Sequence, residues 1–195
     1  GFNEMVLWNY LDDPAGLPHP SHGYWLPLAS IISWLGMVIF QFLPQFTAAR
    51  LPFLILAGMV PPLTAVLAYR LSRERRIGWL AGSFALFSGF YLPYISIPES
   101  FSINLVTGLI FFLMVHKIGA GEAKGWLLFF SGLMIGLMHL SRTEGLVWLG
   151  VLGIWLLWRF ERERNWETFV HGLLGLGGYL LVMGPWFIRN LITFG

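Results

Sequence analysis

Long apolar runs separated by short polar turns make up most of the chain beyond residue 50. Six such runs occur in order, at residues 51–69, 77–97, 101–115, 125–140, 145–158 and 168–188. In a lipid bilayer the backbone is satisfied only in helices or closed barrels, and the period-two alternation typical of barrel strands is absent. The pattern therefore predicts about six transmembrane helices within residues 51–188.

The segment 24–42 is also apolar, but it is interrupted by Pro27 and Gly36. It carries Trp25 and Trp34, and tryptophan is enriched where helices meet the membrane–water interface. We expect a helix here that either lies in the interface or spans the membrane.

Residues 1–28 form a polar stretch that cannot be a regular helix or strand, because three prolines lie between residues 14 and 20. We expect this stretch to be a loop on the outer side of the membrane. It contains Asp12 and Asp13, which can supply a general base or a cation ligand. Asp-Asp-Pro is also typical of a capped turn, which the residues alone favour. His22 lies in the same loop, but it and His19 do not by themselves define a metal site.

The basic residues are divided unequally between the turns. If all six runs span, nine lie on one face and only Arg50, Arg142 and Arg189 on the other. Cytoplasmic loops carry an excess of Lys and Arg, so the nine-residue face is predicted to be cytoplasmic. The nine form three clusters: Arg70, Arg73, Arg75 and Arg76; Lys117 and Lys124; Arg159, Arg162 and Arg164.

The composition agrees with a membrane protein. Of the 195 residues, 56% are hydrophobic and 11% are charged, whereas soluble domains carry about 25% charged residues. The absence of cysteine excludes disulfides, thiolate metal sites and cysteine nucleophiles. The chain begins at Gly1 without a methionine and stops just after a predicted helix, so we expect it to be a fragment of a longer protein and a single transmembrane domain throughout.

Some of the predicted helices are short for a membrane. The runs at 125–140 and 145–158 would extend only about 24 and 21 Å, against a hydrocarbon core of about 30 Å. The run at 101–115 is short as well. Polar backbone below the membrane surface is tolerated where it lines a cavity. We therefore expect an outward-open cavity with three charged residues: Glu99, Arg142 and Glu144.

Each of these three residues has a structural explanation beside the functional one. Glu99 lies between two apolar runs, where an acid costs about 2.5–3.5 kcal/mol, but it also precedes Phe101 as a helix N-cap would. Arg142 offers a planar fork that suits phosphate, or it closes a turn as an ion pair with Glu144. His139 and His171 are expected to be hydrogen-bonded core histidines.

Five stretches together resemble the GT-C membrane glycosyltransferases, and in particular the protein O-mannosyltransferases and bacterial lipid A aminoarabinose transferases. They are PHPSHGYWLPL, TAARLPFLILAG, IPESFSINLVTGLIFF, LSRTEGLVWL and GPWFIRNLITFG. The resemblance implies an all-α, polytopic transmembrane helical bundle with an outer loop and an interfacial helix. It also implies transfer of a sugar from a polyprenyl-phosphate-linked donor to a lipid, glycan or protein acceptor on the outer face of the plasma membrane.

The resemblance further implies an inverting displacement, in which a carboxylate takes the acceptor proton and cations hold the departing phosphate. The main catalytic Asp of this family would precede Gly1, and Asp12 and Asp13 do not clearly match it. Glu99 matches the second acidic position, and Arg142 is the candidate on the phosphate side.

His22 and Glu144 complete the candidate substrate-binding residues. No cofactor and no nucleic-acid partner is expected, although a divalent cation beside the phosphate stays open. Two other classes also stay open: a transporter with an intramembrane Glu99 and Arg142, and a non-catalytic polytopic scaffold.

Overall fold

The computed structural model describes residues 26–87, 97–121 and 124–194, and all regular structure in these ranges is helical. This part therefore confirms the predicted all-α class. By length and composition α4, α7 and α10 are able to cross a membrane, while α3 and α8 are shorter apolar helices. The described helices are α3 Leu28–Ile39, α4 Gln45–Ser72, α5 Arg75–Leu86, α7 Ser100–Gly119, α8 Gly125–Ser141, α9 Gly145–Glu163 and α10 Trp166–Phe194.

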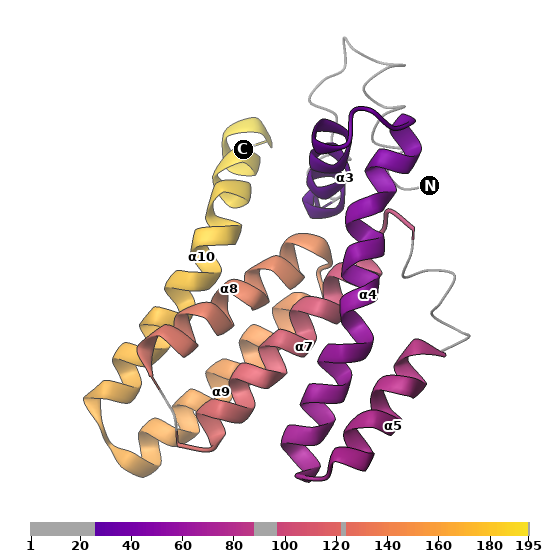
Figure 1. Ribbon diagram of the computed structural model, residues 1–195. Coiled ribbons are helices and arrows are strands. Elements are labelled where there is room, and N and C mark those ends of the chain that lie inside the picture. The colour runs from indigo at the N-terminus through magenta and orange to yellow at the C-terminus, as the bar shows by residue number, and fades with distance from the viewer. Residues whose placement is uncertain (1–25, 88–96, 122–123, 195) are drawn as a thin grey trace.

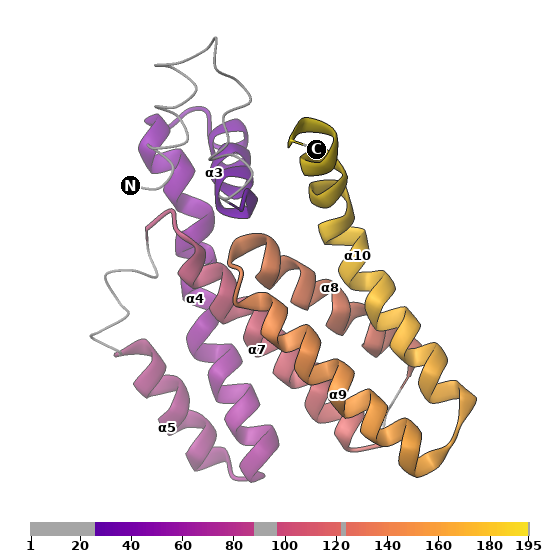
Figure 2. The same cartoon turned by 180° about the vertical axis from the view of Figure 1, so that it is seen from behind.

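Five helices pack side by side in the order α5, α4, α7, α8 and α10 (Figure 1). Helix α9 packs against α8 and α10 and lies in front of α7 when the molecule is seen from behind (Figure 2). Helix α3 packs against the first half of α4 (Figure 1). The α4–α5 and α9–α10 turns and the C-terminal end of α7 all lie at one end of the molecule, the lower end in Figure 1. We call this the basic end, because it carries the three clusters of Lys and Arg defined above.

Several helices differ in length from the prediction. Helix α7 continues to Gly119 and α9 to Glu163, so these helices have 20 and 19 residues and are longer than their predicted apolar runs. Only α8, with 17 residues, keeps the expected shortfall. The premise of a short helix was therefore wrong for α7, which is long and apolar enough to cross a membrane, whereas α9 is not among the helices that meet this condition. Helix α4 runs through Pro52, Pro61 and Pro62 without ending.

The contact between α8 and α10 depends on glycine. A Cβ atom on Gly132 would overlap the carbonyl oxygen of Gly175, and one on Gly178 would overlap that of Phe129. Small residues let membrane helices approach this closely, as in GxxxG pairs. Further along the same contact, His139 Nδ1 and the Tyr179 hydroxyl share a buried hydrogen bond of 2.7 Å, as expected for a core histidine. His171 lies 3.8 Å from the Glu167 carboxylate instead.

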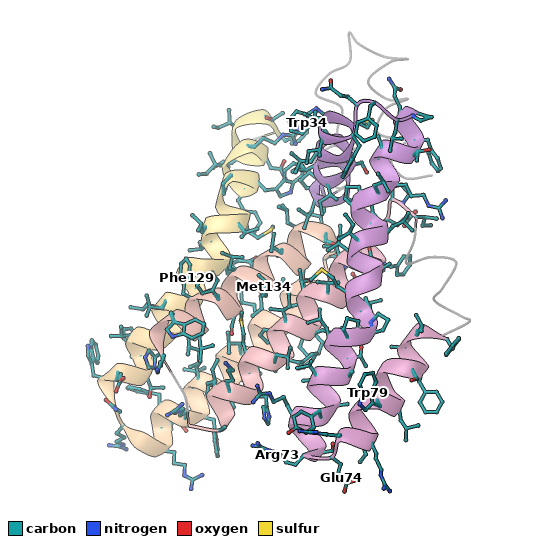
Figure 3. All side chains as sticks on the ribbon, viewed as in Figure 1. Trp34, Arg73, Glu74, Trp79, Phe129 and Met134 are labelled. Carbon is teal, nitrogen blue, oxygen red and sulfur yellow. The ribbon has the colours of Figure 1, made fainter. Side chains whose placement is uncertain are left out.

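Helices α4 and α5 meet in the same way. A Cβ on Gly78 would lie 2.9 Å from the Ala65 carbonyl oxygen, and one on Gly82 would lie 2.9 Å from the Ala65 Cβ. Outside this contact α5 is apolar and open: Trp79, labelled in Figure 3, is 76% exposed. Water-soluble monomers rarely expose large contiguous apolar surfaces. The exposed apolar face is therefore consistent with contact with lipid.

Candidate functional site

The short turn between α8 and α9 positions two of the predicted site residues. The Arg142 N–H donates to the Met138 carbonyl over 2.8 Å, and the Gly145 N–H donates to the Arg142 carbonyl over 3.0 Å. The turn is tight at Gly145, since a Cβ there would overlap the backbone nitrogen of His139. Glycine is therefore required where α9 begins, and the turn holds Arg142 and Glu144 in a fixed relation.

Arg142 and Glu144 form a two-bond ion pair. Nε of Arg142 donates to Oε2 of Glu144 and Nη2 donates to Oε1, both over 3.1 Å. The hydrogen bonds from Arg142 lower the pKa of the Glu144 carboxyl. The same bonds raise the pKa of Arg142, and the negative charge of Glu99 adds to this increase. The structure thus brings Glu99, Arg142 and Glu144 into one electrostatic group.

The pair leaves part of the guanidinium available. An arginine has five N–H donors, and the bonds to Glu144 use two of them. The other three have no hydrogen-bond acceptor among the residues that the structure describes. The guanidinium also lies over the Phe101 ring, with Cζ 5.1 Å from its centroid, which fixes the plane of the fork.

Asn104 joins α7 to the end of α8 beside this group. Its Nδ2 donates to the Ser141 hydroxyl over 2.9 Å and to the Ser100 carbonyl over 3.1 Å. Ser141 is the last residue of α8 and directly precedes Arg142. The bond therefore ties the first turns of α7 to the turn that carries Arg142.

A groove of about 500 Å³ opens beside Arg142 between α7 and α9. Arg142, Glu144 and Asn104 form its polar end, and apolar side chains such as Leu109 form the rest. A further cavity of about 120 Å³ adjoins it, shares Phe112 and Trp148 with it and has only apolar and aromatic lining residues. The Phe112 and Trp148 rings meet edge to face with centroids 5.0 Å apart. The whole space is an apolar groove with the Arg142–Glu144 ion pair at one end, and we call it the Arg142 groove.

The other predicted residues have different positions. Glu99 precedes α7 at the N-cap, but its carboxylate makes no capping hydrogen bond. It does not line the groove and acts on Arg142 through its charge. Asp12, Asp13 and His22 lie outside the described residues. Within the described part of the chain no group of three or more side chains is arranged to hold a metal ion.

Sequence reasoning overlooked several residues of the site. Asn104 has a recognisable signal, because it is a polar residue within an apolar run. Phe101 and Trp148 have none, because aromatic residues occur throughout the chain and only the packing of α7 near α9 brings these two to the groove.

Comparison with known proteins adds no relative: no protein-family model, no curated protein and no solved structure matches the chain.

Proposed function

We propose that the chain belongs to a membrane glycosyltransferase that transfers a sugar from a polyprenyl-phosphate-linked donor to an acceptor on the outer face of the plasma membrane. The observation that carries the proposal is the Arg142 groove. A lipid-linked phosphosugar has an anionic head and a long apolar tail, and the groove offers the unused N–H donors of Arg142 at one end and an apolar, aromatic floor. The resemblance of the five sequence stretches to GT-C enzymes is the second support.

In this proposal the free N–H donors of Arg142 bind the donor phosphate. Charge-assisted hydrogen bonds from a planar guanidinium are among the strongest that a protein makes to phosphate. The prenyl chain lies along Leu109, Phe112 and Trp148. Glu144 holds the guanidinium in place and occupies only two of its five N–H donors.

The transfer is a displacement at the anomeric carbon. The acceptor oxygen forms a bond to this carbon, the bond from the carbon to the phosphate oxygen breaks, and polyprenyl phosphate leaves with the electron pair. A carboxylate takes the acceptor proton. Arg142 stabilises the charge that grows on the departing phosphate. Glu99 orients the acceptor or holds a cation beside the phosphate, and Asp12 and Asp13 in the outer loop are candidate bases.

Donor binding by the purified full-length protein tests the role of Arg142. We expect Arg142→Lys to weaken binding of a polyprenyl-phosphate sugar about tenfold or more, because lysine loses the bidentate fork. Arg189→Lys is the matched control, since Arg189 stacks on Trp186 in α10 and does not line the groove. Binding by Arg142→Ala equal to wild type would remove Arg142 from the site.

A second variant tests the apolar part of the groove. A Cβ on Gly108 meets only the Met138 sulfur, at 3.7 Å, so Gly108→Ala is expected to be tolerated. Gly108→Phe fills the groove and is expected to abolish donor binding. Gly150→Phe is the control, because a Cβ on Gly150 in α9 would have no neighbouring atom within 4 Å and Gly150 does not line the groove.

A further inference from the structure

A second cavity lies at the basic end of the molecule, between α4, α7 and α8. It has a volume of about 260 Å³, and its lining includes Arg70 from α4 and His116 and Lys117 from α7. The remaining lining residues are apolar, among them Leu113 and Trp126, and none of the described residues that line it is acidic. We call it the Arg70–Lys117 pocket.

The two fixed positive charges of this pocket are not neutralised within the described part of the chain. The side chains of Arg70 and Lys117 have neither a hydrogen-bond acceptor nor an ion-pair partner there. Both are exposed, and both face a cavity whose walls are apolar. A site with cationic donors at its mouth and hydrocarbon walls is complementary to an anionic amphiphile.

The position of the pocket along the helices indicates which amphiphile. Arg70 and Lys117 each lie two residues before the end of a helix that is able to span the membrane, α4 at Ser72 and α7 at Gly119. The ends of spanning helices lie at headgroup depth, and Trp126, 52% exposed at the start of α8, is typical of this interface. A phospholipid phosphate lies at this depth.

The size of the pocket limits how much of a lipid it can enclose. Pockets for small molecules enclose about 300–1,000 Å³, and this one is smaller, at about 260 Å³. With basic residues at its mouth and apolar walls, it can enclose only part of a lipid, namely the phosphate and the first part of one acyl chain. The rest of the chain would continue over exposed apolar side chains such as Val66, which is 44% exposed.

We propose that the Arg70–Lys117 pocket binds one anionic phospholipid of the leaflet at the basic end, with its phosphate held by Arg70 and Lys117. Basic pockets between transmembrane helices on the cytoplasmic side bind anionic headgroups in this way. The site is separate from the Arg142 groove: Asn104 and Lys117 are about 20 Å apart along α7. It does not depend on the glycosyltransferase activity.

The test is a lipid titration of the purified full-length protein in neutral detergent, followed by native mass spectrometry. Phosphatidylglycerol, phosphatidylcholine with the same chains, and inorganic phosphate are the three probes. We expect the first phosphatidylglycerol to bind at least tenfold more tightly than phosphatidylcholine, and millimolar phosphate not to displace it. Equal affinity for the two lipids would contradict the proposal. Displacement by phosphate alone would reduce the site to a simple anion site and overturn it too.

Two double variants that each remove two positive charges distinguish binding in the pocket from general electrostatic attraction to the protein surface. Arg70→Gln with Lys117→Gln removes both charge-assisted contacts to the phosphate and is expected to weaken binding about 20-fold or more. Arg75→Gln with Arg76→Gln, at the same end, is expected to change binding less than about twofold, because neither side chain lines the pocket and neutral detergent presents no anionic bilayer surface. Equal losses in both pairs would overturn the proposal.

A third variant keeps every charge and reduces only the volume of the Arg70–Lys117 pocket. Leu113→Phe fills the apolar wall and is expected to weaken phosphatidylglycerol binding about tenfold while Arg70 and Lys117 remain. Unchanged binding would contradict the part of the proposal that places an acyl chain in the pocket. The melting temperature of each variant in lipid-free detergent checks that its fold is intact.

Discussion

Arg142 makes structural contacts with only some of its N–H donors. Glu144 and the Phe101 ring fix the plane of its guanidinium, while three N–H donors have no acceptor in the described part of the chain. The ion pair with Glu144 would be sufficient if Arg142 only stabilised the turn. Arg142 also lines the groove. The groove is what turns a structural ion pair into a candidate phosphate site.

The pair with Glu144 gives stability a defined dependence on pH. Arg142 lowers the pKa of Glu144 in the folded protein. The stabilisation is therefore fully present above the ordinary carboxyl pKa of about 4.3 and is lost as the pH falls through the lower, folded value. An exposed pair of this kind contributes about 0.2–1 kcal/mol.

We expect Glu144→Gln to melt slightly below wild type at pH 7, and the difference to shrink as the pH falls below about 4. Thermal unfolding of the detergent-solubilised protein over this pH range measures the difference. Glu161→Gln, on the exposed part of α9, is the control that removes a carboxylate outside the pair. A difference that persists unchanged at pH 3 would show that the pair is not its source.

At the scale of elements, the close contact of α8 with α10 sets the position of the turn that carries Arg142. The two helices approach until backbone meets backbone at Gly132, Gly175 and Gly178. A methyl group at this contact must push the helices apart. Since α8 ends one residue before Arg142, such a shift reaches the groove.

Gly132→Ala is expected to destabilise the protein by about 1–3 kcal/mol through overpacking. Gly177→Ala is the matched control on α10, because a Cβ there has no neighbour within 4 Å. The control is expected to be neutral or slightly stabilising, since alanine is the better helix former. Chemical denaturation in detergent compares the two, and equal stabilities would refute the close-packing account.

The apolar pattern predicted where helices begin more accurately than where they end. Helix α7 continues past the apolar run through His116 and Lys117, and cations in a last turn interact favourably with the helix dipole. Helix α9 continues through Arg159 and Arg162, whose guanidinium groups lie over Trp155 and Trp158 one turn earlier. A hydropathy pattern alone does not predict that a helix continues through polar residues in this way.

The candidate site was only partly readable from the sequence. Glu99, Arg142 and Glu144 are charged residues between apolar runs, and residue type alone draws attention to them. The groove itself arises from the distance between α7 and α9, where Phe112 from α7 and Trp148 from α9 meet edge to face. This distance is a property of tertiary packing, and no local pattern encodes it.

At the scale of the whole molecule, the two candidate sites lie at opposite ends of α7. The Arg142 groove begins near Phe101, and the Arg70–Lys117 pocket lies near the last turn. The three basic turns share the end with the second pocket, where Figure 3 labels Arg73 and Glu74. By the positive-inside rule this end is predicted to be cytoplasmic and the Arg142 groove to open on the outer side.

Single cysteines in this cysteine-free chain test the orientation directly. Thr143→Cys, in the α8–α9 turn, is expected to react with an impermeant thiol reagent in intact cells. Glu74→Cys, in the α4–α5 turn, is expected to react only after the membrane is opened. Both residues are exposed, so differences in burial do not confuse the comparison. The reverse pattern of labelling would invert the predicted topology.

The most direct test of the proposed function is sugar transfer by the purified full-length protein. Wild type is expected to move a labelled sugar from a polyprenyl-phosphate donor to an acceptor. Glu99→Gln keeps the size of the side chain and removes its charge. Because the carboxylate makes no capping hydrogen bond, this variant is expected to keep its stability and to lose turnover about a hundredfold or more. Near-normal turnover in both Glu99→Gln and Arg142→Ala, or carriage of the sugar across a vesicle membrane without transfer, would contradict the account.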